Sequence, residues 1–138
     1  MTLNAYTDGA SRGNPGESGI GMVVRDEQGS LLFTASGYIG IATNNLAEYA
    51  ALLALLKKVK RIKCTRLIVY SDSELMVRQI NGEYKVKNEQ LGKCRQQIRR
   101  ILEKKPFEFM IKHIPREMNL EADRLANAGI ESRRRLRV

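Results

Sequence analysis

The hydrophobic pattern of the chain changes near residue 43, and this change limits the folds open to it. Before that position, β-rich runs occupy Thr2–Thr7, Ile20–Arg25 and Leu31–Ile39, with a hairpin turn between the last two. After it, the apolar residues from Leu46 to Leu56 recur at the spacing of a helix. Consecutive strands followed by a helix indicate an antiparallel sheet that helices then cover.

Turn and cap residues divide the rest of the chain into further elements. The pattern predicts a glycine-containing loop at Gly9–Ser18, strands at Leu67–Tyr70 and Phe107–Ile114, and helices at Ser73–Asn81, Glu89–Lys105 and Leu120–Ser132. The order β-β-β-α-β-α-α-β-α predicts an α/β fold, a mixed sheet with helices on both faces. All these elements form one domain, residues 1–132. Residues 133–138, with four arginines, are expected to form a basic, flexible tail.

The chain carries a large excess of positive charge. Its 138 residues include 24 Lys and Arg against 15 Asp and Glu, a formal net charge of +9. Such a surface suits a polyanion, either nucleic acid or an anionic membrane. No apolar run approaches the roughly 20 residues of a membrane span, and the N-terminal residues lack the pattern of a signal peptide. We therefore expect a cytoplasmic protein that contacts no membrane, with a monomer as the default state.

Cysteine and histidine usage disfavours a structural zinc site. Cys64 and Cys94 have no CxxC spacing, and His113 is the only histidine. Two free thiols are expected in a reducing compartment, and a disulfide between them is the alternative. His113 lies on a predicted strand and is interpreted as structural.

Four acidic residues stand at positions typical of functional sites. Asp8 and Asp72 follow predicted strands, and Glu48 and Asp123 lie in the first turns of predicted helices. Each also has a local interpretation: Asp8 in a turn, Glu48 as capping-box partner of Asn45, Asp72 as a helix N-cap, and Asp123 at the positive end of its helix.

If the four carboxylates converge, they suit metal-dependent hydrolysis. Carboxylate oxygens are hard ligands that favour Mg²⁺ or Mn²⁺ over zinc. Two such ions about 4 Å apart can activate water and stabilise the leaving oxygen of a phosphodiester. Clustered carboxylates repel one another, and a cation or a raised pKa relieves that repulsion.

Four motifs carry a family resemblance. They read YTDGASRGNPG at residues 6–16, TNNLAE at 43–48, YSDS at 70–73 and PREMNLEADRLA at 115–126. In this order the chain resembles the type 1 ribonuclease H family, in the short bacterial and archaeal form that lacks a basic protrusion. The motifs span nearly the whole chain, and each contains one of the four acids.

The resemblance implies a ribonuclease H-like fold with a five-stranded mixed sheet whose first strand is central. It implies endonucleolytic cleavage of the RNA strand of RNA–DNA hybrids, without base specificity. Two Mg²⁺ or Mn²⁺ ions would be the cofactors, with no small-molecule cofactor. Asp8, Glu48, Asp72 and Asp123 match the family's catalytic, metal-binding carboxylates. Activity on double-stranded RNA is left open.

Several residues are candidates for substrate binding. Recognition of RNA needs a group that both donates to and accepts from the 2′-OH, which suits the amides of Asn14, Asn44 and Asn45. Alternatively, these three asparagines cap helices or stabilise turns. Thr43 and Asn88 match residues of a family pocket for a DNA-strand phosphate.

The chain also departs from some relatives. It has no Trp, whereas some relatives carry a tryptophan-containing basic protrusion. Arg116 stands where other relatives have a glycine-histidine loop; it could contact phosphate but cannot transfer a proton. Glu74 stands where some relatives carry an amide side chain. Lys85 and Lys87 could contribute to a basic face, or could simply face solvent.

Two other functions are less consistent with the sequence. A non-catalytic hybrid binder on the same fold would gain affinity by losing the acids, so their presence argues against it. A dinucleotide-binding domain would need its glycines to open a helix, but Gly16–Gly21 precede a strand.

Overall fold

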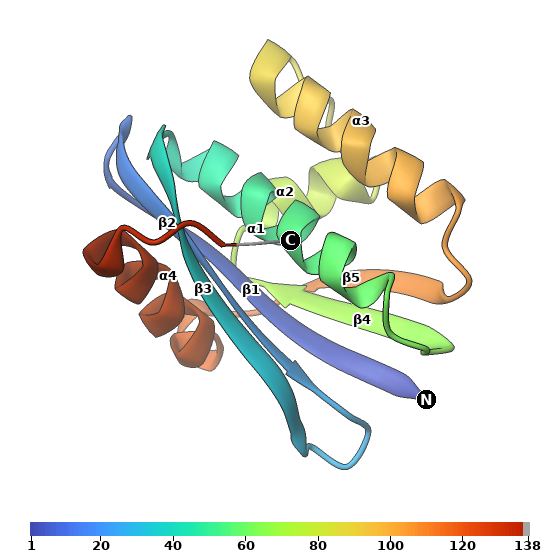
Figure 1. The fold of residues 1–138 in the computed structure, drawn as a ribbon. Coiled ribbons are helices and arrows are strands. Elements are labelled where there is room, and N and C mark those ends of the chain that lie inside the picture. Colours follow the sequence, from blue (N-terminus) through green and yellow to red (C-terminus); the bar gives the residue numbers. More distant parts are fainter. Residues whose placement is uncertain (137–138) are drawn as a thin grey trace.

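The computed structural model describes residues 1–136 (Figure 1). Its strands are β1 (Thr2–Gly13), β2 (Gly16–Arg25), β3 (Leu31–Ala42), β4 (Arg66–Ser71) and β5 (Glu108–His113). Its helices are α1 (Asn44–Val59), α2 (Glu74–Ile80), α3 (Glu89–Glu103), a short 3-10 turn η1 (Arg116–Met118) and α4 (Leu120–Ser132). The element order is the one that the sequence predicts.

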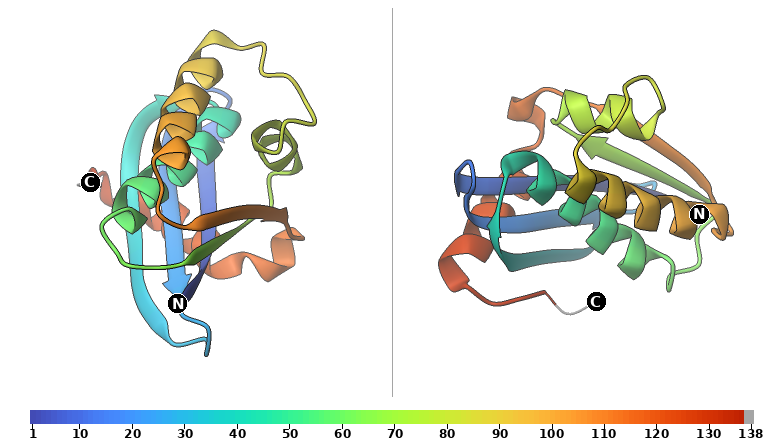
Figure 2. Two further views of the ribbon diagram at one scale, coloured as in Figure 1. Left: turned by 90° about the vertical axis from the view of Figure 1, so that its right-hand side faces the viewer. Right: turned by 90° about the horizontal axis from the view of Figure 1, so that it is seen from above.

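The strands form one five-stranded sheet in the order β3-β2-β1-β4-β5. β1 pairs with β2, and β2 with β3, in antiparallel fashion, whereas β1 with β4 and β4 with β5 are parallel. Helices α1, α2 and α3 lie on one face and α4 on the other (Figures 1 and 2). The mixed sheet, the central β1 and the helices on both faces are confirmed.

The loop predicted at Gly9–Ser18 is wrong. β1 continues to Gly13 and pairs with β2 up to Gly13 and Gly16, so the connection is a tight hairpin. Gly13, with φ +120°, serves the turn itself, whereas Gly9 and Gly21 serve close packing against helices. A Cβ on Gly9 would lie 2.2 Å from the carbonyl carbon of Ala47 in α1, and one on Gly21 would lie 2.4 Å from the Ala122 oxygen in α4.

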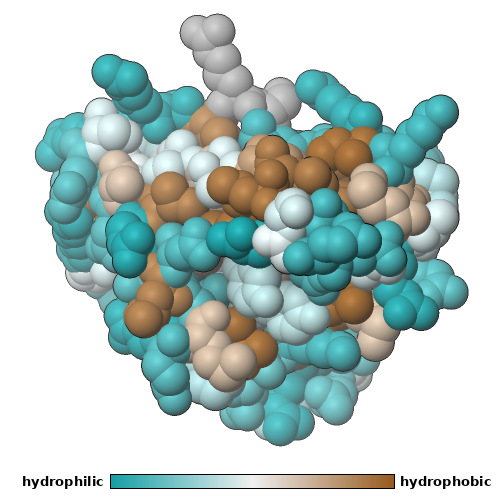
Figure 3. Space-filling model, turned by 90° about the horizontal axis from the view of Figure 1, so that it is seen from below, coloured by the Kyte–Doolittle hydropathy of each residue, from teal (hydrophilic) through white to brown (hydrophobic). Residues whose placement is uncertain are grey.

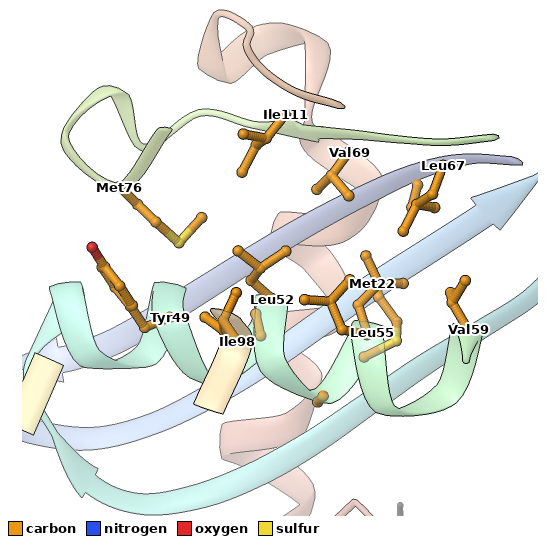
Figure 4. Packing of buried hydrophobic residues seen from close by; sticks show 14 of the residues in the cluster. Met22, Tyr49, Leu52, Leu55, Val59, Leu67, Val69, Met76, Ile98 and Ile111 are labelled. Atoms are coloured by element: carbon orange, nitrogen blue, oxygen red, sulfur yellow. The ribbon is translucent and has the colours of Figure 1, made fainter. Parts of the chain in front are cut away.

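The main core lies between the sheet and α1. Figure 4 shows side chains of α1 facing those of the strands: Tyr49, Leu52, Leu55 and Val59 opposite Met22, Leu67 and Val69, all buried. Removing a fully buried leucine side chain from such a core costs about 2–5 kcal/mol. This packing fixes α1 on the sheet, and with it Glu48. That residue lies in the second turn of α1, so its predicted place in the first turn is wrong.

The surface of the molecule is largely hydrophilic on the face seen from below, around a band of apolar side chains (Figure 3). Among residues 1–136, no helix is both long and apolar enough to cross a bilayer. Cys64 and Cys94 are buried free thiols, as the sequence predicts, and do not form the alternative disulfide.

The first residues of the basic tail lie along β3. The Tyr38 amide donates to the Arg134 carbonyl oxygen at 2.7 Å. The Arg135 guanidinium lies 5.7 Å from the centre of the Tyr38 ring, and Leu136 packs against the core. Residues 137–138 are outside the described part of the chain, and a separate flexible tail beyond residue 132 stays a prediction.

Candidate active site

Two of the four acids lie where the pairing of the central parallel strands stops. The register of β1 and β4 ends at Thr7 opposite Ser71, so Asp8 and Asp72 are the next residues of the two strands. The carboxyl ends of parallel strands form the edge of the sheet at which ligands bind. Asp8 nevertheless lies inside β1, because that strand continues in its pairing with β2. The sequence interpretation of Asp8 as a turn residue is therefore wrong.

Glu48 reaches this edge from α1. Its Oε1 accepts a hydrogen bond from the Gly9 amide at 2.8 Å, and the residue is 7% exposed. Because Gly9 has no side chain, the backbone of α1 can come close enough for this bond. The carboxylate is thus aimed by a contact between residues 39 positions apart.

The capping roles considered for the acids belong to other residues. Thr43, not Asn45, caps α1 by accepting from the Leu46 amide at 3.2 Å. Ser73, not Asp72, caps α2 by accepting from the Met76 amide, also at 3.2 Å. The capping interpretations of Glu48 and Asp72 are therefore wrong, and both carboxylates are available to the site.

The carboxylates converge. One oxygen from each of Asp8, Glu48 and Asp72 lies within 4.8 Å of the others. Asp123, from the first turn of α4, lines the same cleft of about 430 Å³. Its carboxyl is close enough to Asp8 to raise the pKa of that group, but it is not part of the close trio.

Burial and mutual repulsion raise the pKa values of two of these groups. The pKa of Asp8 rises from 3.8 to about 8, first because burial disfavours the charged form and then because Asp72 and Asp123 are close. The nearby Arg116 opposes this shift. The pKa of Glu48 is well above its usual range for the same first cause, with Asp8 and Asp72 adding to it and the Gly9 hydrogen bond opposing it.

This donor set fits a divalent cation. The close trio offers carboxylate oxygens alone, the hard ligands that Mg²⁺ and Mn²⁺ prefer. Without a cation, the raised pKa values mean that protons reduce the repulsion between these groups. A cation relieves the same repulsion and needs the carboxylates deprotonated.

The candidate substrate-binding residues divide into two groups. Asn44, Asn45 and Arg116 line the cleft with the carboxylates. The Arg116 side chain is 79% exposed, with its guanidinium 4.0 Å from the Asp123 carboxylate. Asn14 lies in the β1–β2 turn, and its Oδ1 accepts from the Asn44 amide at 3.1 Å.

The second group lies at helix N-termini beyond the residues that line the cleft. Thr43 caps α1, and Asn88 caps α3 by accepting from the Leu91 amide at 3.1 Å. The one histidine, His113, ends β5 on the surface and is likewise not part of the cleft lining.

Sequence reasoning missed Asn119. This residue is 2% exposed, and its Nδ2 donates to the Thr7 carbonyl oxygen at 2.9 Å and, more weakly, to Asp72 Oδ2 at 3.4 Å. Its Oδ1 has no hydrogen-bond partner. Asn119 thereby ties the start of α4 to the end of the parallel strand pairing. In the sequence, Asn119 is marked by its place just before the helix that carries Asp123, but that place does not reveal its contact with Thr7.

Together, this mixed sheet and the acidic cluster at its edge define the ribonuclease H-like class of metal-dependent nucleases. Comparisons with known proteins agree. Residues 6–129 match the family model described as "Reverse transcriptase-like". The chain is 36% identical to the "Ribonuclease HI" of Halobacterium salinarum over 94% of its own length, and 38% identical to the "Bifunctional protein Rv2228c" of Mycobacterium tuberculosis over 96%.

The chain spans 64% of the length of the first of these relatives and 36% of the second. The fold is similar to that of LC11-RNase H1, solved in complex with an RNA/DNA hybrid, with a TM-score of 0.90 and 42% identity. That match covers 94% of this chain and 97% of the solved one. The chain belongs to the type 1 ribonuclease H family.

Proposed function

We propose that the protein is an endonuclease that hydrolyses the RNA strand of RNA–DNA hybrids, without base specificity, using divalent metal ions. The observation that carries this proposal is the convergence of three carboxylates within 4.8 Å at the carboxyl edge of the sheet. A site of oxygen ligands in a protein of net charge +9 suits an anionic substrate that brings phosphates to a metal centre.

Four carboxylates would hold two Mg²⁺ or Mn²⁺ ions: Asp8, Glu48 and Asp72 from the close trio, and Asp123 from the rim. When bound, such ions activate water and stabilise the leaving oxygen in phosphodiester hydrolysis. The protein's own contribution is to orient these ligands. The Gly9 amide holds the carboxylate of Glu48, and Asn119 holds that of Asp72.

Side chains around the cleft would recognise the RNA strand. The Oδ1 of Asn14 is occupied by the Asn44 amide, which leaves its NH₂ group to donate to a ribose or phosphate oxygen. Asn44 and Asn45 lie beside the carboxylates, where an amide can both donate to and accept from a 2′-OH. The exposed guanidinium of Arg116 would contact a phosphate next to the scissile bond.

The DNA strand would be recognised through a phosphate. Thr43 and Asn88 each use an oxygen to cap a helix, which leaves the Thr43 hydroxyl proton and the Asn88 NH₂ group available as donors. The helix N-termini also favour a negative charge. This pocket would select hybrids over double-stranded RNA if it enforces the geometry of a DNA strand.

We further propose that the protein acts as a monomer in the cytoplasm and needs no small-molecule cofactor. Two buried free thiols suit a reducing compartment. The removal of RNA primers and of R-loops would be its cellular use.

The test uses end-labelled RNA–DNA, RNA–RNA and DNA–DNA duplexes, each with Mg²⁺, Mn²⁺ or EDTA, and compares the wild type with Asp72→Asn. The proposal requires that the RNA strand of the hybrid is cut, that the metal is needed and that Asp72→Asn is inactive. Cleavage of RNA–RNA as well would mean that the Thr43 and Asn88 pocket does not enforce a DNA strand. Hybrid binding without cleavage in any metal would mean a binding protein and would refute the proposal.

A further inference from the structure

A buried polar junction joins α1, α2 and the segment that leads into α3. Gln79, near the end of α2, is 5% exposed. Its Oε1 accepts from the Tyr49 hydroxyl at 2.5 Å, and its Nε2 donates to the Lys85 carbonyl oxygen at 3.1 Å. Burial raises the pKa of Tyr49 to about 12, so the hydroxyl remains a donor at neutral pH. Both ends of the Gln79 amide are therefore used.

Gln79 anchors the part of this segment that has few other bonds. The first part, up to Tyr84, is tied to the end of α2, because the amides of Glu83 and Tyr84 both donate to the Arg78 carbonyl oxygen. Among residues 1–136, the Gln79 amide supplies the one hydrogen bond to the backbone of residues 85–87. The side chain of Val86 packs against the core.

This anchoring decides where three polar side chains lie. Val86 is partly buried, whereas Lys85, Lys87 and Asn88 are exposed. Val86 thus faces the core, while both lysines face solvent. Asn88 follows at once and caps α3. Two ammonium groups and an amide are thus presented on one short, ordered segment.

We propose that Gln79, held in place by Tyr49, is a positioning residue for the nucleic acid: it holds residues 85–88 so that Lys85, Lys87 and Asn88 meet the phosphates of one strand. This inference rests on the proposed function. Lysines and amides contact phosphates without reading sequence, as suits an enzyme without base specificity. A pre-ordered segment loses less conformational entropy on binding than a mobile one, which would support affinity in a chain that has no Trp.

The test is the Gln79→Met variant, which nearly keeps the side-chain volume and removes both hydrogen bonds. We expect its KM for a hybrid to rise about fivefold, with kcat changed by less than about twofold. The slope of log KM against log salt should also become shallower, by roughly 0.9 for each phosphate that the lysines no longer neutralise. A purely structural defect would not change that slope.

Val77→Ala is the matched control, because Val77 is also 5% exposed in α2 but makes none of these hydrogen bonds. It should lower the melting temperature and leave KM and the salt slope unchanged. In a background that already carries Lys85→Ala and Lys87→Ala, Gln79→Met should raise KM by less than about twofold, because residues that act through each other are not additive.

Tyr49→Phe is the second variant, for the case that Gln79→Met does not fold. It removes the hydroxyl that orients the amide and should raise KM about twofold at constant kcat. An unchanged KM and salt slope in whichever variant folds would overturn the proposal. That result leaves the cleavage activity of the wild type intact, whereas a wild type that cuts no hybrid would refute the proposed function instead.

Discussion

The floor and the rim of the cleft are built in different ways. On the floor, Asp8 and Glu48 are 5% and 7% exposed, sit on or against the central strand, and have raised pKa values. On the rim, the side chains of Arg116 and Asp123 are 79% and 27% exposed. The floor concentrates buried charge, which costs folding free energy, whereas the rim carries groups that water already solvates. Floor substitutions should therefore alter both turnover and stability, whereas rim substitutions should leave stability nearly unchanged.

The strongest test of this contrast is Asp8→Asn. We expect cleavage to fall by at least about 10³-fold, because the neutral amide is a poor metal ligand at the centre of the trio. In EDTA the same variant should be more stable than the wild type, because it removes a buried carboxyl from a group of like charges. Single-turnover cleavage and thermal unfolding measure the two effects.

Asp26→Asn is the control, since Asp26 lies in the β2–β3 turn and accepts there from the amides of Gln28 and Ser30. It should retain full activity. If Asp8→Asn kept more than about a tenth of the wild-type rate, Asp8 would not be a metal ligand and the floor would have another role.

The second test displaces the backbone that holds the floor carboxylates and keeps all of these carboxylates. In Gly9→Ala, the new Cβ would lie 2.2–2.4 Å from backbone atoms of Ala47 and Glu48, which have no flexible end that could move away. We expect a loss of about 3 kcal/mol in the free energy of unfolding and a drop in cleavage of about 10²-fold, because displacement of α1 misplaces the Glu48 carboxylate.

Gly92→Ala is its matched control. Apart from its chain neighbours and the backbone of its own helix, α3, no atom lies within 4 Å of a Cβ at Gly92. Alanine there should stabilise the helix by about 0.5–1 kcal/mol and leave cleavage unchanged. Equal behaviour of the two variants would show that the close approach of α1 to β1 does not hold the site together.

These variants also show what the sequence could reveal. Asp8, Glu48, Asp72 and Asp123 can be singled out as candidate site residues from the sequence. Each stands at the end of a predicted strand or the start of a predicted helix, and each lies within a short motif. Asn119 escapes such reasoning because its hydrogen bond to Thr7 spans 112 positions, and no local pattern encodes such a contact. Gly9 is wrongly assigned to a loop because α1, the helix that packs against its missing side chain, begins 35 positions further along the sequence.

The third test uses pH to separate floor from rim. In the unfolded chain Asp8 loses its proton near its ordinary pKa of 3.8, whereas in the folded protein the pKa is about 8. Between these values the folded state binds the additional proton, so the stability of the metal-free protein falls as pH rises from about 4 to about 8. The total change is on the order of a few kcal/mol.

Thermal unfolding in EDTA at pH 5 and pH 8 measures this loss. Mg²⁺ should reduce it, because the cation takes the place of the proton. Asp8→Asn should make this fall smaller without removing it, because burial also keeps the pKa of Glu48 raised, whereas Arg116→Ala on the rim should leave the full fall in stability. A wild type that is equally stable at both pH values in EDTA would contradict the raised pKa of Asp8.

The smallest effect belongs to Asn88, which has two duties that one substitution can separate. Aspartate caps a helix about as well as asparagine and favours the positive end of α3, so Asn88→Asp should leave stability within about 0.5 kcal/mol of the wild type. It removes the NH₂ donor and adds a negative charge, so the KM for a hybrid should rise about fivefold while kcat is retained. Asn88→Ala, which loses both duties, should lower stability by about 1 kcal/mol as well. If Asn88→Asp left KM unchanged, Asn88 would be a helix cap alone, and the DNA-strand phosphate would have to be bound without it.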